Sequence, residues 1–181
     1  MPDETDKPPL SRVFAVSELR DTGRNIVVTA RPAELAALAQ LNGLVSVVSL
    51  EAEFRVAKRE RKGLSVQGEL RARVVQTCVV SLEPFEADVL EQIDVRFEPQ
   101  GAALAPDAAF ASLAESDPPD PIVDGKVDLG ALAGEYLALG LDPYPRKPGA
   151  ALPPGFDAGA AAVPSPFAGL GDGLARKGNK I

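Results

Sequence analysis

The stretch LSVQGELRARV, at residues 64–74, alternates apolar and polar side chains along its whole length. Successive side chains of a β-strand point to opposite faces of the sheet, so a period of two predicts a strand with one buried and one solvated face. The apolar parity, which we expect to face the core, consists of Leu64, Val66, Gly68, Leu70, Ala72 and Val74.

The segments on both sides of this stretch, 44–56 and 85–97, show the same alternation, with Ser46 and Glu91 as exceptions on the apolar parity. Three long half-buried runs with short connections predict an antiparallel meander. The apolar parity of the first run is Leu44, Val48, Leu50, Ala52, Phe54 and Val56, and that of the last run is Phe85, Ala87, Val89, Ile93, Val95 and Phe97.

Two helices are predicted outside the meander, at 31–43 and 128–140. The first has a proline in its first turn and ends at an Asn-Gly pair, and the second begins at a capping aspartate, Asp128, and ends at Gly140. We expect both helices to pack on the apolar face of the sheet. Their apolar stripes are Leu35, Leu38 and Leu41 in the first, and Leu129, Leu132, Tyr136 and Leu139 in the second.

Shorter elements complete the fold. Strands are predicted at 12–16 and 25–30, and Asp124-Gly125 is typical of a tight turn between two very short strands. The sequence therefore predicts an α+β fold: an antiparallel meander sheet, open or partly closed into a barrel, with two main helices packed on it and a Pro/Gly-rich C-terminal tail.

The chain divides into three parts. A polar leader at 1–10 is expected to be disordered, a single α+β domain spans 11–145 with a long proline-interrupted loop at 99–120, and a flexible tail spans 146–181. Within the tail, 165–176 carries apolar residues at helical spacing but is too short for a stable isolated helix. We expect this element to dock, either on its own domain or on a partner.

Composition narrows the function classes. The net charge is −7, histidine is absent and there is one cysteine. Without histidine, no Ser-His-Asp triad or Cys-His pair can form, and one cysteine cannot supply a zinc site. There is no nucleotide-binding glycine motif and no apolar run of the roughly 20 residues that span a bilayer. The sequence favours a cytoplasmic binding or assembly protein, with no cofactor, membrane contact or small-molecule substrate, over an enzyme.

The single cysteine, Cys78, follows the second run of the meander. A catalytic thiol needs a base or a positive environment that favours the thiolate. The chain has no histidine, and Arg71 and Arg73 lie on the solvated parity. We therefore interpret Cys78 as a small buried residue at a strand end, whose replacement by alanine should affect stability only mildly.

Five carboxylates cluster in sequence between residues 117 and 135, and carboxylates can hold a hard cation. They lie around prolines and a turn, where aspartate is favoured for local hydrogen bonds, and they lack EF-hand spacing. We interpret them as structural: Asp117, Asp120, Asp124, Asp128 and Glu135.

A short basic run lies between the first two strands of the meander, and a second basic segment ends the chain. Such cations can contact a nucleic-acid backbone, or they can form a solvated hairpin tip that protects a strand end from aggregation. The acidic charge of the whole chain leaves both interpretations open. The candidate contacts with RNA or a protein partner are Lys58, Arg59, Arg61 and Lys62 in the hairpin, and Phe167, Leu170, Arg176 and Lys177 in the tail.

Three stretches, in order, resemble the YceD family, the large ribosomal RNA subunit accumulation proteins: VQGELRARVVQTCVVSLEPFEADV at 66–89, KVDLGALAGEYLALGLDPYPRKPG at 126–149 and SPFAGL at 165–170. The resemblance covers roughly residues 10–176, and the chain looks most like an alphaproteobacterial member. The family motif often reads Cys-x-x-Cys-Leu, whereas this chain has Cys78-Val-Val-Ser81-Leu82. Any metal or disulfide role of a second cysteine is therefore absent from this chain.

The resemblance implies a role in the accumulation of large-subunit ribosomal RNA and no known enzymatic activity. We expect a non-enzymatic ribosome-biogenesis factor that supports 23S rRNA synthesis, processing or accumulation by binding a pre-50S particle through the hairpin and the tail. The alternative is an acidic adaptor that binds a basic ribosomal protein without RNA contact. A third hypothesis is a ribonuclease that uses carboxylates with Mg²⁺.

Overall fold

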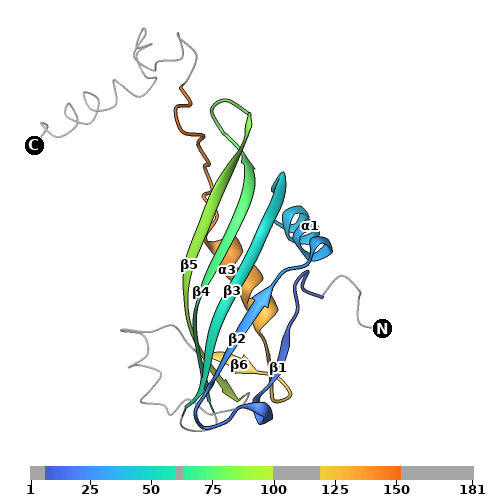
Figure 1. Cartoon of the computed structure of the whole chain (residues 1–181), viewed down its shortest axis with the longest axis vertical. Coiled ribbons are helices and arrows are strands. Elements are labelled where there is room, and N and C mark those ends of the chain that lie inside the picture. The colour runs from blue at the N-terminus through green and yellow to red at the C-terminus, as the bar shows by residue number, and fades with distance from the viewer. Residues whose placement is uncertain (1–6, 60–62, 100–118, 152–181) are drawn as a thin grey trace, which may run out of the picture.

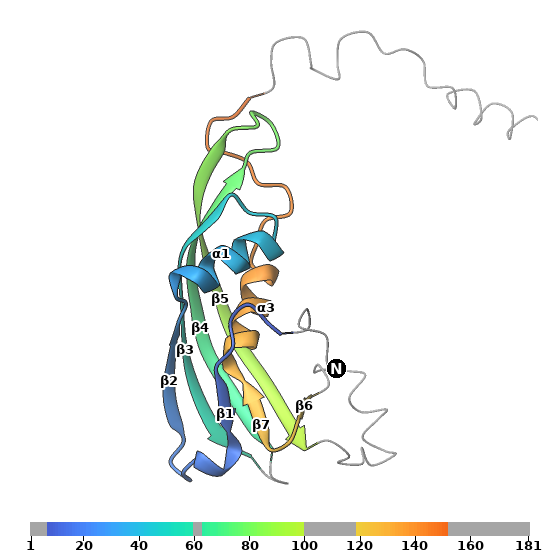
Figure 2. The ribbon, with the colours of Figure 1, turned by 90° about the vertical axis from the view of Figure 1, so that its right-hand side faces the viewer.

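The computed structural model describes residues 7–59, 63–99 and 119–151. A five-stranded sheet in the order β2-β3-β4-β5-β6 forms its centre, β1 and β7 pair as a separate two-stranded sheet, and both helices lie on one side of the larger sheet (Figures 1 and 2). The elements in chain order are β1 Val13–Ala15, the 3-10 helix η2 Val16–Glu18, β2 Arg24–Thr29, α1 Pro32–Leu41, β3 Ser46–Lys58, β4 Leu64–Thr77, β5 Pro84–Pro99, β6 Asp120–Ile122, β7 Lys126–Asp128 and α3 Leu129–Leu139.

This architecture confirms the predicted α+β fold. Strands β3, β4 and β5 pair antiparallel in the expected meander, and β2 extends it on the far side of β3. The short strand β6 joins parallel to the end of β5. The larger sheet is open and does not close into a barrel.

The middle of the sheet packs around one aromatic side chain. Phe54 of β3 lies opposite Gly68 of β4, which in turn lies opposite Ile93 of β5, and both large side chains are buried. A Cβ atom on Gly68 would lie 2.1 Å from the backbone oxygen of Glu53. The absence of a side chain at Gly68 therefore lets β3 and β4 approach closely at this row.

A β-bulge corrects the predicted beginning of the first long strand. The register of β3 against β4 shifts between Val47 and Ser49. Because an extra residue reverses the parity on one side of a bulge, Val47 is buried and Val48 is exposed, the opposite of the prediction. From Leu50 onward the predicted core parity is correct.

Both helices form as predicted, but two of the leucines assigned to their buried stripes are exposed: Leu41 by 68% and Leu139 by 73%. Leu41 is the last residue of α1, and Leu38 carries the buried contact one turn earlier. In the last turns of α3 the buried leucine is Leu137, one turn after the buried Ala133. Leu139 lies about 200° further around a helix that turns about 100° per residue, so it faces away from the core.

Asp128 caps α3 as predicted, accepting hydrogen bonds from two backbone N–H groups of the first turn at 3.0 and 3.1 Å. The same carboxylate accepts the Ser11 hydroxyl at 2.5 Å and the backbone N–H of Arg12 at 2.6 Å. Burial raises the pKa of Asp128, but these four hydrogen bonds hold it below its ordinary value. The cap therefore also joins the N-terminal segment to α3, and Leu10, the last residue of the predicted leader, is buried in the core.

The predicted Asp124-Gly125 turn is also confirmed. Both residues have positive φ, 50° and 68°, as in the type I′ turns that join tight hairpins. The two short strands that flank the turn join different sheets, because β6 pairs with β5 while β7 pairs with β1. The turn thus links the edge of the large sheet to the small one.

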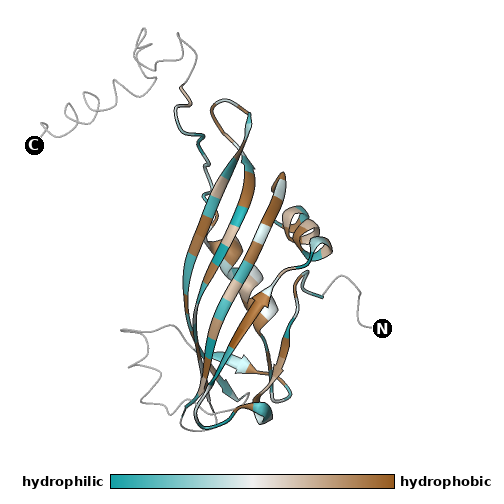
Figure 3. Cartoon of the chain, in the orientation of Figure 1, coloured by the Kyte–Doolittle hydropathy of each residue, from teal (hydrophilic) through white to brown (hydrophobic). Residues whose placement is uncertain are grey.

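The face of the large sheet opposite the helices is polar. Figure 3 shows apolar and polar residues alternating along the long strands. One row across this face, from β2 to β5, consists of Thr29, Glu51, Arg71 and Leu90. We call this the outer face.

Candidate nucleic-acid interface

Basic residues from two separate segments meet at one end of the large sheet. The predicted basic hairpin begins at Lys58, where β3 ends, and Arg24 at the start of β2 lies opposite Val56 of the same strand. The loop that leads into β2 therefore runs beside the hairpin. We define the basic end as the four cations Arg20, Arg24, Lys58 and Arg59, all of which are exposed.

Two of these four cations form ion pairs. The Nζ atom of Lys58 lies 2.7 Å from Asp21 Oδ1, and this hydrogen bond lowers the pKa of Asp21. Arg24 lies 3.5 Å from Glu18 and also stacks its guanidinium 5.8 Å from the ring centroid of Phe14.

The remaining two cations, Arg20 and Arg59, form no ion pair with any residue that the structure describes. The described part of the basic end thus has four cations against two carboxylates, Glu18 and Asp21. It is positive, on a chain whose net charge is −7.

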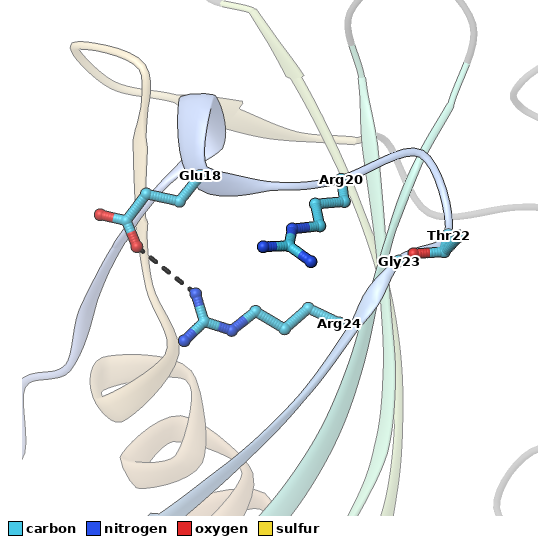
Figure 4. A pocket seen from close by; sticks show the side chains of 5 residues that line it. All are labelled: Glu18, Arg20, Thr22, Gly23 and Arg24. Carbon is cyan, nitrogen blue, oxygen red and sulfur yellow. Dashed lines mark hydrogen bonds and ion pairs between the residues drawn. The ribbon is translucent and has the colours of Figure 1, made fainter.

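A polar cavity of about 450 Å³ opens at this end, lined by Glu18, Arg20, Thr22, Gly23 and Arg24. Figure 4 shows the guanidinium groups of Arg20 and Arg24 directed into the same space, with Glu18 bound to Arg24 alone. Two guanidinium groups that face one cavity, with a carboxylate bound to only one of them, favour an additional anion between them. A phosphate group fits this chemistry, because the planar guanidinium donates its paired N–H groups to two of the phosphate oxygens.

Sequence reasoning found only part of this site. It identified Lys58 and Arg59, which the structure places at the basic end, but it missed Arg20 and Arg24. The two arginines flank a turn more than 30 positions earlier in the chain, and only the β2–β3 pairing brings them to the hairpin. A sequence signal did exist, since cations stand on both sides of the turn at 21–23.

The other sequence-predicted contacts lie outside the described residues: Arg61, Lys62, Phe167, Leu170, Arg176 and Lys177. The hairpin is closed at its base, because the backbone N–H of Arg59 donates to the oxygen of Gly63 at 2.8 Å. The basic run was predicted to lie between two paired strands. This prediction is therefore confirmed for the described residues on its two sides, Arg59 and Gly63.

Cys78 is fully buried just after β4, as the sequence predicted. Its sulfur accepts three backbone N–H groups, from Val80 and Ser81 at 3.4 Å and from Lys147 at 3.3 Å. Hydrogen bonds from Ser81 lower the pKa of Cys78 to about 6, while burial opposes this shift. The thiol thus joins the β4–β5 turn to the segment after α3, a role that sequence reasoning missed.

Three carboxylates, Asp120, Asp128 and Glu135, line a cavity of about 310 Å³ beside Phe97. Burial, followed by the charges of Asp120 and Asp128, raises the pKa of Glu135. The oxygens of Asp128 already accept four hydrogen bonds, and residues 7–59, 63–99 and 119–151 contain no group of three or more His, Cys, Asp or Glu side chains that could hold a metal ion. Asp128 caps α3 and Asp124 lies in a turn, as the sequence predicted, whereas Asp117 lies outside the described residues.

The family model described as "Large ribosomal RNA subunit accumulation protein YceD" matches residues 66–171 of the chain. No curated protein and no solved structure matches the chain. Within the described residues, no helix is long and apolar enough to cross a membrane.

Proposed function

Because this chain belongs to the YceD family of large ribosomal RNA subunit accumulation proteins, we propose that it is a non-enzymatic ribosome-biogenesis factor that binds 23S rRNA in a cytoplasmic pre-50S particle. The family description supports a role with large-subunit RNA. The single observation that carries the RNA contact is the pair of guanidinium groups, Arg20 and Arg24, that line one cavity, where Glu18 is bound to Arg24 alone.

Binding fits this chain better than catalysis. The chain has no histidine, its one thiol is sealed from solvent with three N–H donors on the sulfur, and Asp128 is saturated by hydrogen bonds. General acid–base catalysis needs a titratable group within reach of a substrate. The exposed guanidinium groups of the basic end donate hydrogen bonds and attract phosphate.

The physics of the basic end predicts modest, salt-sensitive affinity. Each phosphate that a cation neutralises releases counterions, and the slope of log K against log salt changes by about 0.7 to 0.9 per contact. Among the described residues, only Arg20 and Arg59 of the basic end form no ion pair, so we expect specificity to come from the shape of the RNA or from a neighbouring protein. The protein would then act inside an assembled particle and bind naked RNA weakly.

The test is binding of fluorescent 23S rRNA fragments by the full chain across a salt series. We expect the double variant Arg20→Glu/Arg24→Glu to bind about tenfold more weakly and to reduce the salt slope by about 1 to 2. The matched control, Arg71→Glu/Arg146→Glu, makes the same change in net charge at exposed arginines outside the basic end.

Three results of this experiment would exclude the RNA contact. They are equal binding by both double variants, a salt slope unchanged by the loss of Arg20 and Arg24, and no measurable binding by the parent chain even at low salt. Circular dichroism shows whether the Arg20→Glu/Arg24→Glu variant is folded. If it is unfolded, Arg20→Gln/Arg24→Gln replaces it.

The second candidate function is an adaptor that binds a basic ribosomal protein without RNA contact. It is favoured by the net charge of −7, which opposes nucleic acid over most of the surface. The two functions separate by ultraviolet crosslinking in cells. RNA crosslinks at the basic end favour direct contact, whereas protein crosslinks without RNA favour the adaptor.

A further inference from the structure

The edge of the large sheet at β5 is long and open. Of the 16 residues in β5, Phe97–Pro99 pair with β6, and the residues 84–96 have β4 as their only strand partner in the described part of the chain. Figure 1 shows β5 at the margin of the sheet beyond β4. Backbone N–H and C=O groups of alternate residues on such an edge are directed away from β4 and can pair with another strand.

The opposite edge of the sheet differs in length and charge. It is formed by β2, Arg24–Thr29, which has six residues, one arginine and no carboxylate. The β5 edge has about twice that length. A strand added at β5 could therefore form many more ladder hydrogen bonds than one added at β2.

Residues 84–96 of β5 are strongly acidic. They contain four carboxylates and one arginine, so the edge has a net charge of −3: Glu86, Asp88, Glu91, Asp94 and Arg96. Arg73 of β4 pairs with Asp88 at 2.9 Å, and no ion pair with a described residue involves the other three carboxylates. Glu91 lies on the helix side of the sheet, close to Gly140, so the unpaired carboxylates that the outer face offers to a partner are Glu86 and Asp94.

The end of β5 near Phe97 adds further negative charge. Asp120 on β6 and Glu135 on α3 share a cavity with Phe97. Burial, and then the charges of Asp120 and Asp128, raise the pKa of Glu135.

The edge also offers one apolar contact. Leu90 lies on the outer face, in register with Arg71 and between Asp88 and Gln92, and it is 62% exposed. In a β-sheet, a side chain directly opposite or diagonal on an added strand packs against such a residue. Leu90 can therefore favour one register of an added strand.

We propose that the β5 edge, residues 84–96, binds an extended basic peptide of a protein partner, which adds as a new strand beside β5 and places lysine or arginine on the acidic outer face. A second copy of this chain fits poorly, because pairing of two β5 edges brings two segments of net charge −3 together. Acidic edges also oppose this form of self-association in general. Charge complementarity thus selects a basic occupant.

This site is separate from the basic end, so one protein can hold RNA at one surface and a basic peptide at another. The inference goes beyond the proposed RNA contact and does not rest on it. The peptide experiment contains no RNA, so its failure leaves the RNA contact untouched, and loss of RNA binding leaves the β5 edge untouched.

The test uses the full chain and a synthetic 11-residue peptide that alternates lysine and threonine. We expect hydrogen exchange of β5 amides to slow on peptide binding, and binding to weaken at least tenfold in the double variant Glu86→Lys/Asp94→Lys. The matched control, Glu51→Lys/Glu53→Lys, reverses two carboxylates of the outer face on β3, about 10 Å from β5. This control should retain most of the affinity.

Two N-methylated peptides make the test independent of any change in the protein. Methylation of every second backbone nitrogen removes the donors on one edge of the peptide. One of the two complementary methylation patterns should abolish binding to the parent chain, and the other should preserve it.

The proposal is overturned by equal binding of both methylated peptides, by protection outside β5, by unchanged affinity in the Glu86→Lys/Asp94→Lys variant, or by no binding at millimolar peptide. Concentration-dependent protection of β5 amides without peptide would show that a second copy occupies the edge, which also contradicts it.

Discussion

The contact between Arg12 and Glu34 gives a stability prediction whose magnitude follows from the structure. The two side chains form a bidentate pair, with Arg12 Nη1 2.7 Å and Nη2 2.8 Å from the two oxygens of Glu34. The backbone N–H of Arg31 donates to the same carboxylate at 2.7 Å. Glu34 therefore joins the N-terminal segment to the first turn of α1.

The hydrogen bond from Arg12, and then that from the Arg31 N–H, lower the pKa of Glu34 from 4.5 to about 2. A difference of about 2.5 pH units corresponds to about 3.4 kcal/mol. The side chains of Arg12 and Glu34 are 29% and 18% exposed, so solvent screening reduces the contribution to about 2 kcal/mol. We expect Glu34→Gln to lower the free energy of unfolding at pH 7 by this amount.

The pH dependence of this loss has a defined sign. Because the folded-state pKa of Glu34 is depressed, its contribution is present above the unfolded value of about 4.5 and disappears as the pH falls toward about 2. The difference between parent and Glu34→Gln should thus shrink to less than half at pH 3. Urea unfolding at pH 7, 5, 4 and 3 measures it, with the exposed Glu51→Gln as the control. A difference that is absent at pH 7, or that stays constant to pH 3, would show that the Arg12–Glu34 pair does not supply this stability.

Three other substitutions test the fold. Gly68→Ala should destabilise the chain by about 3 kcal/mol, because the new Cβ would lie 2.1 Å from a backbone oxygen. The control is Gln67→Ala at the adjacent exposed position, and its free energy of unfolding in urea should stay within about 0.5 kcal/mol of the parent value. Cys78→Ala should lower the free energy of unfolding by about 2 kcal/mol, more than the sequence alone predicted, because three N–H groups lose their acceptor. Cys78→Ser should recover part of this loss, as measured by thermal unfolding. Accumulation of rRNA should persist in either variant that folds. Asp128→Ala should cost about 2 to 3 kcal/mol and raise hydrogen exchange at the start of α3, and an effect under 0.5 kcal/mol would contradict its role as the cap.

The meander could be predicted because its physics is local. Period-two alternation in 64–74 and 85–97 places each side chain on a face without any knowledge of the rest of the chain. The bulge at Val47 could not be predicted, because an extra residue in one strand is defined only by its register against the partner strand.

The parts of the site that sequence reasoning missed depend on long-range pairing. Arg24 reaches the hairpin through its register with Val56, and the sulfur of Cys78 receives its third donor from Lys147, 69 residues away. The open edge of β5 is likewise a property of strand order, which no single segment encodes. Local periodicity defines the elements, and their pairing defines the site.

The most direct test of the RNA contact is sedimentation of the tagged protein and its variants through sucrose gradients of cell extract. We expect the parent and the Arg71→Glu/Arg146→Glu control to migrate with 50S precursors, and the folded Arg20→Glu/Arg24→Glu variant to shift to the top of the gradient while 23S rRNA falls. Migration of both double variants with 50S precursors, or a parent chain that never leaves the top of the gradient, would contradict the RNA contact.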